Sequence, residues 1–210
     1  MTDRFAHKKI GLLGGSFNPA HDGHRYISLQ ALRLLGLDEV WWLVSPLNPL
    51  KETNADMAAF SRRLESAERT ANHPRIRISS VESEIGTRYT ADTLEKLREM
   101  HPQTHFVWLM GADNLADFHR WHRWKDIIRI VPIAVFARKN YTLKALHGKA
   151  GRMFRLYRQN PGAAKKLARM RPPAWVFLPI RRHPASSTEI RRRGLFLTGE
   201  ESERSKENGG

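Results

Sequence analysis

Residues 10–24 read Ile-Gly-Leu-Leu-Gly-Gly-Ser-Phe-Asn-Pro-Ala-His-Asp-Gly-His, an apolar run followed by a glycine turn and two histidines. The pattern predicts a strand over Lys9–Leu13 and a helix over 21–35. Gly14 and Gly15 let backbone N–H groups approach an anion closely. The helix start adds unpaired N–H groups and the positive end of a dipole. The stretch therefore predicts a polyphosphate site at a strand-to-helix turn.

His21 and His24 are three residues apart and share a helix face. No Gly-Lys-Ser/Thr follows the glycines, and their spacing is not that of a dinucleotide fingerprint. One alternative is a plain corner with two surface histidines. Another is a metal site, but Asp22 points away from the shared face and no cysteine is present to complete it. A histidine pair directly after a glycine turn favours phosphate binding.

Composition limits the class of protein. The chain has 210 residues, 40% of them hydrophobic, and no cysteine, which excludes disulfides and thiol chemistry. We expect one domain over residues 1–197 and a disordered polar tail over 198–210. No stretch has the length of a membrane span, and the N-terminus lacks a signal-peptide core. These features favour a cytoplasmic protein.

Strand and helix patterns alternate along the chain, which predicts a single α/β Rossmann-like domain with a mostly parallel sheet and helices on both faces. In such a sheet, ligands bind at the carboxyl ends of the strands, near the point where the strand order reverses. The expected strands are Lys9–Leu13, Glu39–Val44, Arg75–Ser79, His105–Met110, Pro132–Ala137 and Trp175–Leu178. The expected helices are 21–35, Phe60–Asn72, Thr90–Met100, Ala112–Phe118, Trp124–Ile130 and Thr142–Met170, the last broken near residue 160.

A second candidate phosphate site lies near the other end of the chain, where residues 185–193 read Ala-Ser-Ser-Thr-Glu-Ile-Arg-Arg-Arg. Ser186 and Glu189 have the spacing of a capping box and predict a short helix. Ser187 and Arg191 are four residues apart and share a face of that helix. A helix start that carries hydroxyls and a guanidinium suits a phosphate.

The formal net charge of +15 implies acidic partners, and both nucleic acid and small phosphorylated substrates qualify. Much of the excess lies in residues 138–193, above all in 152–171, where basic and apolar residues alternate. We interpret this segment as a solvated face. Association with RNA or a membrane is the alternative.

The two motifs together, 14–24 and 186–191, resemble those of the HxGH nucleotidylyltransferase superfamily. Over most of its length the chain is similar to the bacterial nicotinate-nucleotide adenylyltransferases of NAD synthesis. It departs from that family at Leu50, where histidine is frequent, and at Ala185, where isoleucine is frequent. Four further segments are similar to the family's substrate loop, Tyr-Thr helix start, Gly-x-Asp segment and Phe-x-x-Trp segment: Pro46–Lys51, Arg88–Leu94, Met110–Leu115 and Phe118–Trp121.

The resemblance implies transfer of the adenylyl group of ATP to nicotinate mononucleotide, giving deamido-NAD and pyrophosphate, with Mg²⁺ bound alongside ATP. It implies catalytic roles for His21, His24, Lys51 and Arg191. The implied ATP-binding residues are Gly14, Gly15, Ser16, Phe17, His21, His24, Gly111, Asp113, Ser187, Thr188 and Arg191. The implied residues for nicotinate mononucleotide are Asn48, Lys51, Tyr89, Thr90 and Trp121, with Thr90 at the ring carboxylate and Trp121 stacked on the ring.

Simpler roles compete with these. Thr90 and Asp113 could cap helices, and Trp121 could pack a helix against the sheet. A sister transferase acting on nicotinamide mononucleotide or pantetheine phosphate is the nearest alternative function. A basic RNA-binding protein and a non-catalytic nucleotide-binding regulator are the others, but no RNA-binding signature is present, so we expect no nucleic-acid partner. The sequence leaves the oligomeric state open, a homo-oligomer included.

Overall fold

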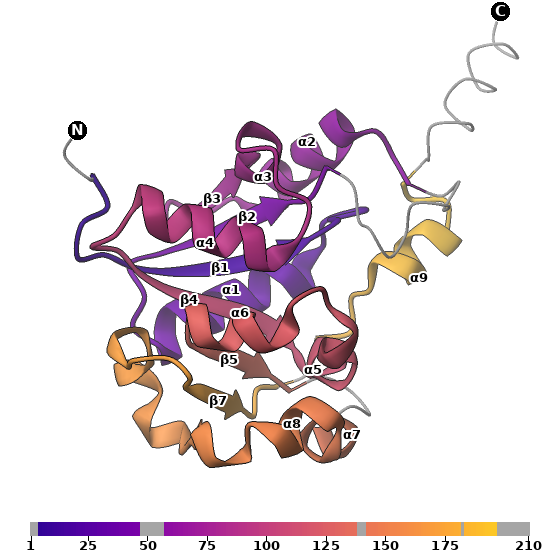
Figure 1. The fold of residues 1–210 in the computed structure, drawn as a ribbon. Helices are drawn as coiled ribbons and strands as arrows, with labels where there is room; N and C mark the ends of the chain where they lie inside the picture. The colour runs from indigo at the N-terminus through magenta and orange to yellow at the C-terminus, as the bar shows by residue number, and fades with distance from the viewer. Residues whose placement is uncertain (1–3, 47–56, 138–141, 182, 197–210) are drawn as a thin grey trace, which may run out of the picture.

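The computed structural model describes residues 4–46, 57–137, 142–181 and 183–196. Its described strands form one seven-stranded sheet in the order β3-β2-β1-β4-β5-β7-β6, and every neighbouring pair is parallel (Figure 1). The predicted α/β Rossmann-like class is confirmed. The strands are β1 (Lys9–Gly15), β2 (Glu39–Val44), β3 (Ile76–Ser79), β4 (His105–Gly111), β5 (Ile133–Phe136), β6 (Arg158–Gln159) and β7 (Trp175–Leu178).

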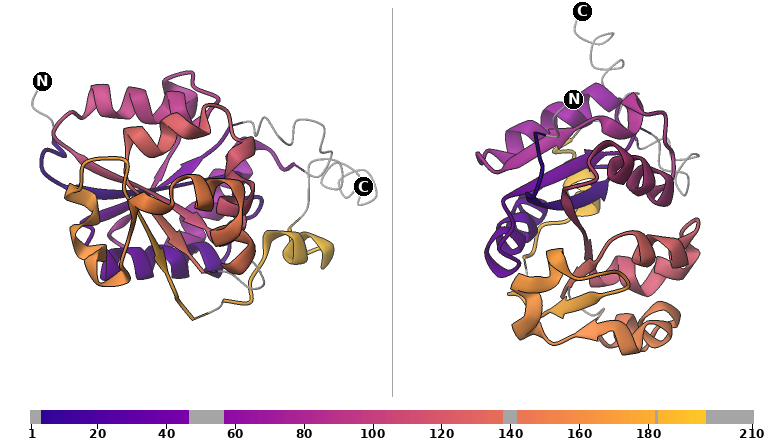
Figure 2. Two further views of the ribbon diagram at one scale, coloured as in Figure 1. Left: turned by 60° about the horizontal axis from the view of Figure 1, so that its bottom comes forward. Right: turned by 60° about the vertical axis from the view of Figure 1, so that its left-hand side comes forward.

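Helices cover both faces of the sheet (Figure 2). Packed against one face are α1 (Asp22–Leu34), α2 (Phe60–Ala71) and the 3₁₀ helix η3 (Pro161–Arg169). Packed against the other are α4 (Thr90–Met100), α5 (Ala112–Asp117), α6 (Trp124–Ile130), α7 (Thr142–His147) and α8 (Lys149–Met153). Short elements complete the described chain: α3 (Val81–Glu84), η1 (Phe118–Arg120), η2 (Arg155–Tyr157) and α9 (Ser187–Arg192).

The side chains of β2 explain the two layers. All six residues of this strand are buried. Trp41 and Leu43 join the core under α4, whereas Val40, Trp42 and Val44 join the core under α1 and α2. Successive side chains of a strand point to opposite faces, so an unbroken apolar run requires helices on both sides.

A glycine is required where β1 ends. A Cβ built at Gly14 would overlap the Trp108 indole, which lies directly beneath this part of the chain. The close approach places a large, buried β4 side chain under the glycine turn. Any larger residue at position 14 would force the turn or the indole to move.

The structure differs from the expected elements in the C-terminal half. The segment 142–170 is not largely helical: it divides into α7, α8, η2, the two-residue strand β6 and η3. Gly148 and Gly151 lie against main-chain carbonyls of α7, so the backbone turns back on itself there instead of extending one helix. The short helix α3 is not among the expected elements. None of the described helices is long and apolar enough to cross a membrane.

The strand order reverses between β1 and β4. From β1 the chain proceeds through β2 to β3 on one side, and then returns to β4 on the other. A crevice at the carboxyl ends of two such strands is the usual ligand site of this fold. β1 ends at Gly15 and β4 at Gly111, and α1 and α5 begin close after these ends. In Figure 1 the strand arrows point toward the side of the molecule where α9 lies.

Candidate active site

The two histidines of the first motif cap the start of α1 with their own rings. His21 is the N-cap residue, and its Nδ1 accepts a hydrogen bond from the Gly23 N–H at 3.0 Å. His24 Nδ1 accepts from the His21 N–H at 3.2 Å, and the two ring centroids are 3.9 Å apart. Because each Nδ1 is an acceptor, we assign the ring proton of each neutral imidazole to Nε2. The capping bonds therefore orient two Nε2–H donors at one helix start.

The His24 ring is held in place by aromatic packing. Its centroid lies 4.8 Å from that of Phe17 and 5.9 Å from that of Trp42, and the Phe17 and Trp42 rings stack at 5.0 Å. Phe17 has a positive φ of 46°, which a residue with a side chain rarely adopts. The whole residue is only 1% exposed, so its ring is packed in the core and is not offered to a ligand. Packing thus fixes the turn that the two motif histidines follow.

The second motif is docked on the first. Ser187 Oγ donates to the Pro19 carbonyl at 3.0 Å, and Arg191 Nη1 donates to the Asn18 carbonyl. Asn18 and Pro19 lie three and two residues before His21, although they lie about 170 residues from α9 in the sequence. The predicted meeting of the two distant segments at one place is therefore what the structure shows.

The predicted capping box at α9 is wrong in its side-chain contacts. Ser186 does occupy the N-cap position, but its side chain makes no capping hydrogen bond. Glu189 instead pairs with Arg192 Nη2 at 2.9 Å and with Arg193 Nε at 2.8 Å. Arginines three and four residues later on the same short helix compete successfully for the carboxylate. Arg191 is left to contact the loop before α1.

The start of α4 and the segment 121–123, which precedes α6, meet at one place that we call the corner. The Tyr89 and His122 ring centroids lie 4.3 Å apart, so the start of α4 meets the segment that precedes α6. Thr90 follows Tyr89 and Trp121 precedes His122; these two are the pair expected at the nicotinate ring. Thr90 is the first residue of α4 rather than its N-cap, which is Tyr89, so the capping alternative for Thr90 is wrong.

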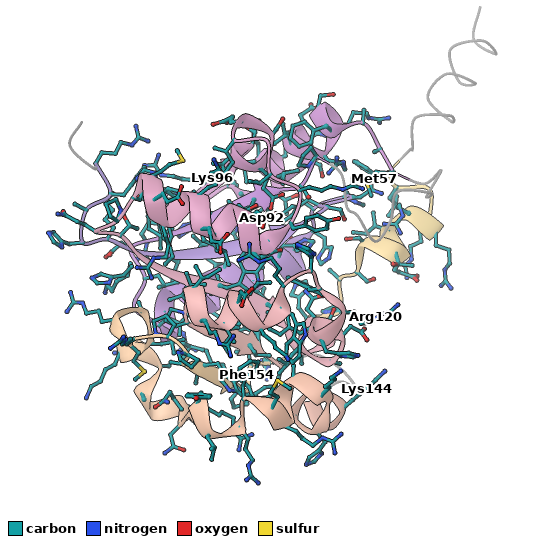
Figure 3. All side chains as sticks on the ribbon, in the orientation of Figure 1. Met57, Asp92, Lys96, Arg120, Lys144 and Phe154 are labelled. Atoms are coloured by element: carbon teal, nitrogen blue, oxygen red, sulfur yellow. The ribbon has the colours of Figure 1, made fainter. Side chains whose placement is uncertain are left out.

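Arg123 holds this corner from outside. Its guanidinium donates to Asp92 at 3.0 Å and to Glu95 at 2.6 and 2.9 Å, and its Nε donates to Asp126 at 3.1 Å. The hydrogen bond from Arg123 lowers the pKa of Glu95. Asp92 and Glu95 lie on α4, whereas Asp126 lies on α6, so one arginine ties the two helices that carry the corner. Figure 3 labels Asp92 on α4.

Trp121 connects the corner to the aromatic side chains under the glycine turn. Its ring is edge-on to that of Trp108 at 6.2 Å and to that of Phe118 at 5.4 Å, and it stays partly exposed. Trp108 also lies beneath Gly14, so an aromatic row leads from the glycine turn to the corner. Both phosphate motifs and the corner therefore stand at the carboxyl edge of the sheet.

Comparisons with known proteins fit this geometry. Residues 12–193 match the family model described as cytidylyltransferase-like. A protein of Ruegeria sp. (strain TM1040) named "Probable nicotinate-nucleotide adenylyltransferase" is 50% identical over 187 residues, which cover 89% of this chain and 98% of the relative. A protein of the same name from Parvibaculum lavamentivorans is 52% identical over 186 residues, covering 89% and 92%. The chain belongs to the nicotinate-nucleotide adenylyltransferase family.

The solved structures agree on the fold. The Plasmodium falciparum nicotinic acid mononucleotide adenylyltransferase complexed with NaAD superposes with a TM-score of 0.66 at 20% identity, covering 89% of this chain and 83% of that one. A Vibrio parahaemolyticus nicotinate-nucleotide adenylyltransferase structure, described as putative, gives 0.53 at 22% identity, covering 64% and 77%. At this identity the likeness concerns architecture alone.

Not every residue expected from the family resemblance is placed. Asn48 and Lys51 lie outside the described residues, as does the segment 198–210. Gly111 is the N-cap of α5 and Asp113 stands in its first turn. Both therefore lie at the reversal of strand order, where the family resemblance puts the ATP nucleoside.

A cavity of about 630 Å³ opens at the opposite edge of the sheet, lined by basic residues that include Arg98, His105 and Arg169. It contains none of the residues that the adenylyltransferase motifs supply. Arg98 donates to the Ile130 carbonyl at the end of α6, an ordinary cation at a helix C-terminus. The basic side chains of the 152–171 segment are exposed, as a solvated face requires.

Proposed function

We propose that this member of the adenylyltransferase family transfers the adenylyl group of ATP to nicotinate mononucleotide, by a mechanism in which the two docked motifs hold the triphosphate. The observation that carries the mechanism is the contact of Ser187 and Arg191 with the Pro19 and Asn18 carbonyls. It unites a helix start, two imidazoles and a guanidinium at one edge of the sheet. Such a set of donors suits several phosphate groups in a row.

The reaction needs alignment more than acid–base chemistry. A phosphate oxygen of the mononucleotide attacks the α-phosphorus of ATP, a P–O bond forms, and the bond from that phosphorus to the bridging oxygen breaks. Pyrophosphate leaves with the electron pair. The nucleophile is already an anion, so no side chain has to remove a proton. Positioning and stabilisation of the developing charge then supply the catalysis.

Each donor has a role in this scheme. The Nε2–H groups of His21 and His24 stabilise charge as it grows on the bridging oxygen. Ser187, Thr188 and Arg191 bind the β- and γ-phosphates. The backbone of the Gly14–Phe17 turn faces the nucleotide, and Lys51 is proposed to contact the phosphate being transferred. Burial of the Phe17 ring and the orientation of both Nδ1 atoms support these assignments.

The acceptor is assigned to the corner at α4. The N–H groups at the start of this eleven-residue helix favour a carboxylate through the helix dipole. The partly exposed Trp121 ring offers a flat partner for a heteroaromatic ring. An amide in place of the carboxylate would lose the charge interaction, which favours nicotinate over nicotinamide mononucleotide.

Mg²⁺ is proposed to come with ATP, bound mainly by phosphate oxygens and water. Among the residues that the structure describes, no three histidine or carboxylate side chains are grouped to hold a metal ion. Magnesium typically keeps several waters and few protein ligands, so we expect ATP and water to supply most of its coordination. We also assign the enzyme to the cytoplasm, where ATP is available.

Pyrophosphate release tests the acceptor directly. Purified protein with ATP and Mg²⁺ is given nicotinate mononucleotide, nicotinamide mononucleotide or pantetheine phosphate in parallel. We expect kcat/KM for the nicotinate substrate to exceed that for the amide by at least about 10-fold, the value of one lost charged hydrogen bond. Faster turnover with either rival acceptor would assign the chain to a sister reaction.

Trp121→Ala tests the ring site. Loss of the stacking face is expected to raise the KM for nicotinate mononucleotide about 10-fold, equivalent to about 1.4 kcal/mol, with the KM for ATP within about twofold. Trp124→Ala is the matched control, because Trp124 packs on Phe118 at 6.0 Å and on Phe154 at 5.6 Å, against the core under α6 and α8. If both variants change the KM equally, Trp121 has only a packing role.

A further inference from the structure

Arg63 and Glu82 are buried charged side chains that belong to neither motif. Arg63, on α2, is 1% exposed, and Glu82, in α3, is 6% exposed. Burying such a group is costly unless the protein supplies its hydrogen bonds. The partners of each side chain therefore indicate which parts of the molecule it holds.

The Arg63 guanidinium binds four main-chain carbonyls. Its Nε donates to Ala58 at 3.0 Å, and its Nη2 donates to Pro46 at 2.9 Å. Its Nη1 donates to Ser16 at 2.8 Å and to Ser45 at 2.7 Å. Ser16 precedes α1, whereas Ser45 and Pro46 follow β2. The rigid fork therefore holds the phosphate turn and the start of the substrate loop at a fixed separation.

Within the described residues no carboxylate neutralises the charge of Arg63 directly, since the hydrogen bonds of its guanidinium there all go to carbonyls. Burial lowers the pKa of Arg63, but a guanidinium remains protonated in proteins. Its positive charge consequently stays beneath a site that receives two phosphate-bearing substrates.

Glu82 performs the matching role on the other side. Its carboxyl group accepts hydrogen bonds from the Ser45 side chain and, at 3.4 Å, from the Thr93 hydroxyl on α4. Thr93 is in turn 2.9 Å from the Thr87 hydroxyl. Burial raises the pKa of Glu82, and its Oε2 has no hydrogen-bond partner in the described part of the chain.

Ser45 joins the two side chains. Its N–H donates to the Gly15 carbonyl at 3.0 Å, its carbonyl accepts from Arg63, and its hydroxyl bonds Glu82. We propose that Arg63, Ser45 and Glu82 form a buried positioning relay, which fixes the phosphate turn relative to the start of α4. The inference rests on the proposed function, because it assigns the relay to the alignment of two anionic substrates.

Kinetics of three relay variants test this alignment. Arg63→Lys keeps the charge but not the fork, and we expect kcat to fall about 30-fold, since misplacement by about 1 Å can cost about 100-fold. Glu82→Ala is expected to raise the KM for nicotinate mononucleotide about 10-fold with the KM for ATP within about twofold, on the scale of one lost buried hydrogen-bond partner. Glu82→Gln is expected to restore most of that loss, because an amide oxygen can accept the same hydrogen bonds.

Leu167→Ala is the matched control for lost stability. Leu167 is a fully buried residue of η3, which packs on β4 and β7 and not on the relay, and its truncation is expected to lower the Tm by leaving a cavity. Its kcat and both KM values should remain within about twofold of wild type, because distant sites act independently. Arg63→Lys and Glu82→Ala variants that are folded, less stable and kinetically indistinguishable from Leu167→Ala would overturn the relay.

Ser45→Ala keeps the proposal testable if Arg63→Lys does not fold. Removing this hydroxyl is expected to raise the KM for nicotinate mononucleotide, and the Ser45→Ala/Glu82→Ala double variant should be no worse than Glu82→Ala alone, as for residues in one network. Fully additive effects would overturn the relay. Wild-type protein without adenylyl transfer would instead refute the proposed function, so the two failures are distinguishable.

Discussion

His24→Ala is expected to lower kcat by about 100-fold or more, the usual loss when one oriented donor to a developing charge is removed. The Nδ1 of this ring is held by the His21 N–H, and its face packs on Phe17 and Trp42, so the Nε2–H is fixed before substrate arrives. A donor aimed at the bridging oxygen matters most when charge has moved there. The KM for ATP should therefore change less than about fivefold, because ground-state binding loses little.

His147→Ala is the control for this variant. His147 is an exposed residue at the end of α7, away from the motifs, and its loss should leave kcat within about twofold, as for most surface substitutions. Steady-state kinetics at saturating nicotinate mononucleotide measure both variants. A kcat for His24→Ala within about threefold of wild type, or about 0.7 kcal/mol, would exclude this histidine from the chemical step.

Local pattern was enough to predict much of the fold. The buried run of β2 and the glycine turn after β1 each determine structure within a few residues, through side-chain alternation and close backbone approach. The shared helix face of Ser187 and Arg191 likewise follows from their spacing. The alternation of such segments then leaves few topologies other than a parallel sheet with helices on both faces.

Contacts between distant segments could not be predicted in this way. The sequence around α9 does not indicate that Arg191 contacts the Asn18 carbonyl. It also does not indicate that Glu189 pairs with Arg192 and Arg193 instead of capping the helix. Only the family resemblance united the two motifs. The break-up of residues 142–170 likewise depends on glycines that lie against carbonyls of α7.

The relay did leave a signal in the sequence. Arg63 shares the buried face of α2 with Ser66, Ala67 and Ala71, at helical spacing. An arginine in a row of small, inward-facing residues indicates a buried cation and hence a set of acceptors. Glu82 left no comparable signal, because α3 has only four residues and no periodicity to place the side chain.

Arg191→Ala is expected to lower kcat/KM for ATP about 100-fold, equivalent to about 2.7 kcal/mol, as for a charged hydrogen-bonded group at a phosphate site. Two losses combine in this variant. The guanidinium no longer binds phosphate, and α9 loses its bond to the Asn18 carbonyl, so that Ser187 and Thr188 are less well placed. Arg191→Lys should recover little, because a lysine cannot bind the carbonyl and a phosphate with one planar fork.

Arg192→Ala is the control that separates these effects from simple loss of charge. Arg192 is the next residue on α9, is exposed, and pairs with Glu189 rather than with the loop before α1. Its removal changes the net charge of the chain by the same amount, yet kcat/KM for ATP should stay within about twofold, because a surface ion pair contributes little. Equal losses in the Arg191 and Arg192 variants would show that general positive potential attracts ATP. A large difference, confined to the KM for ATP and to kcat, would instead show that the closure of α9 over the histidine loop builds the triphosphate site.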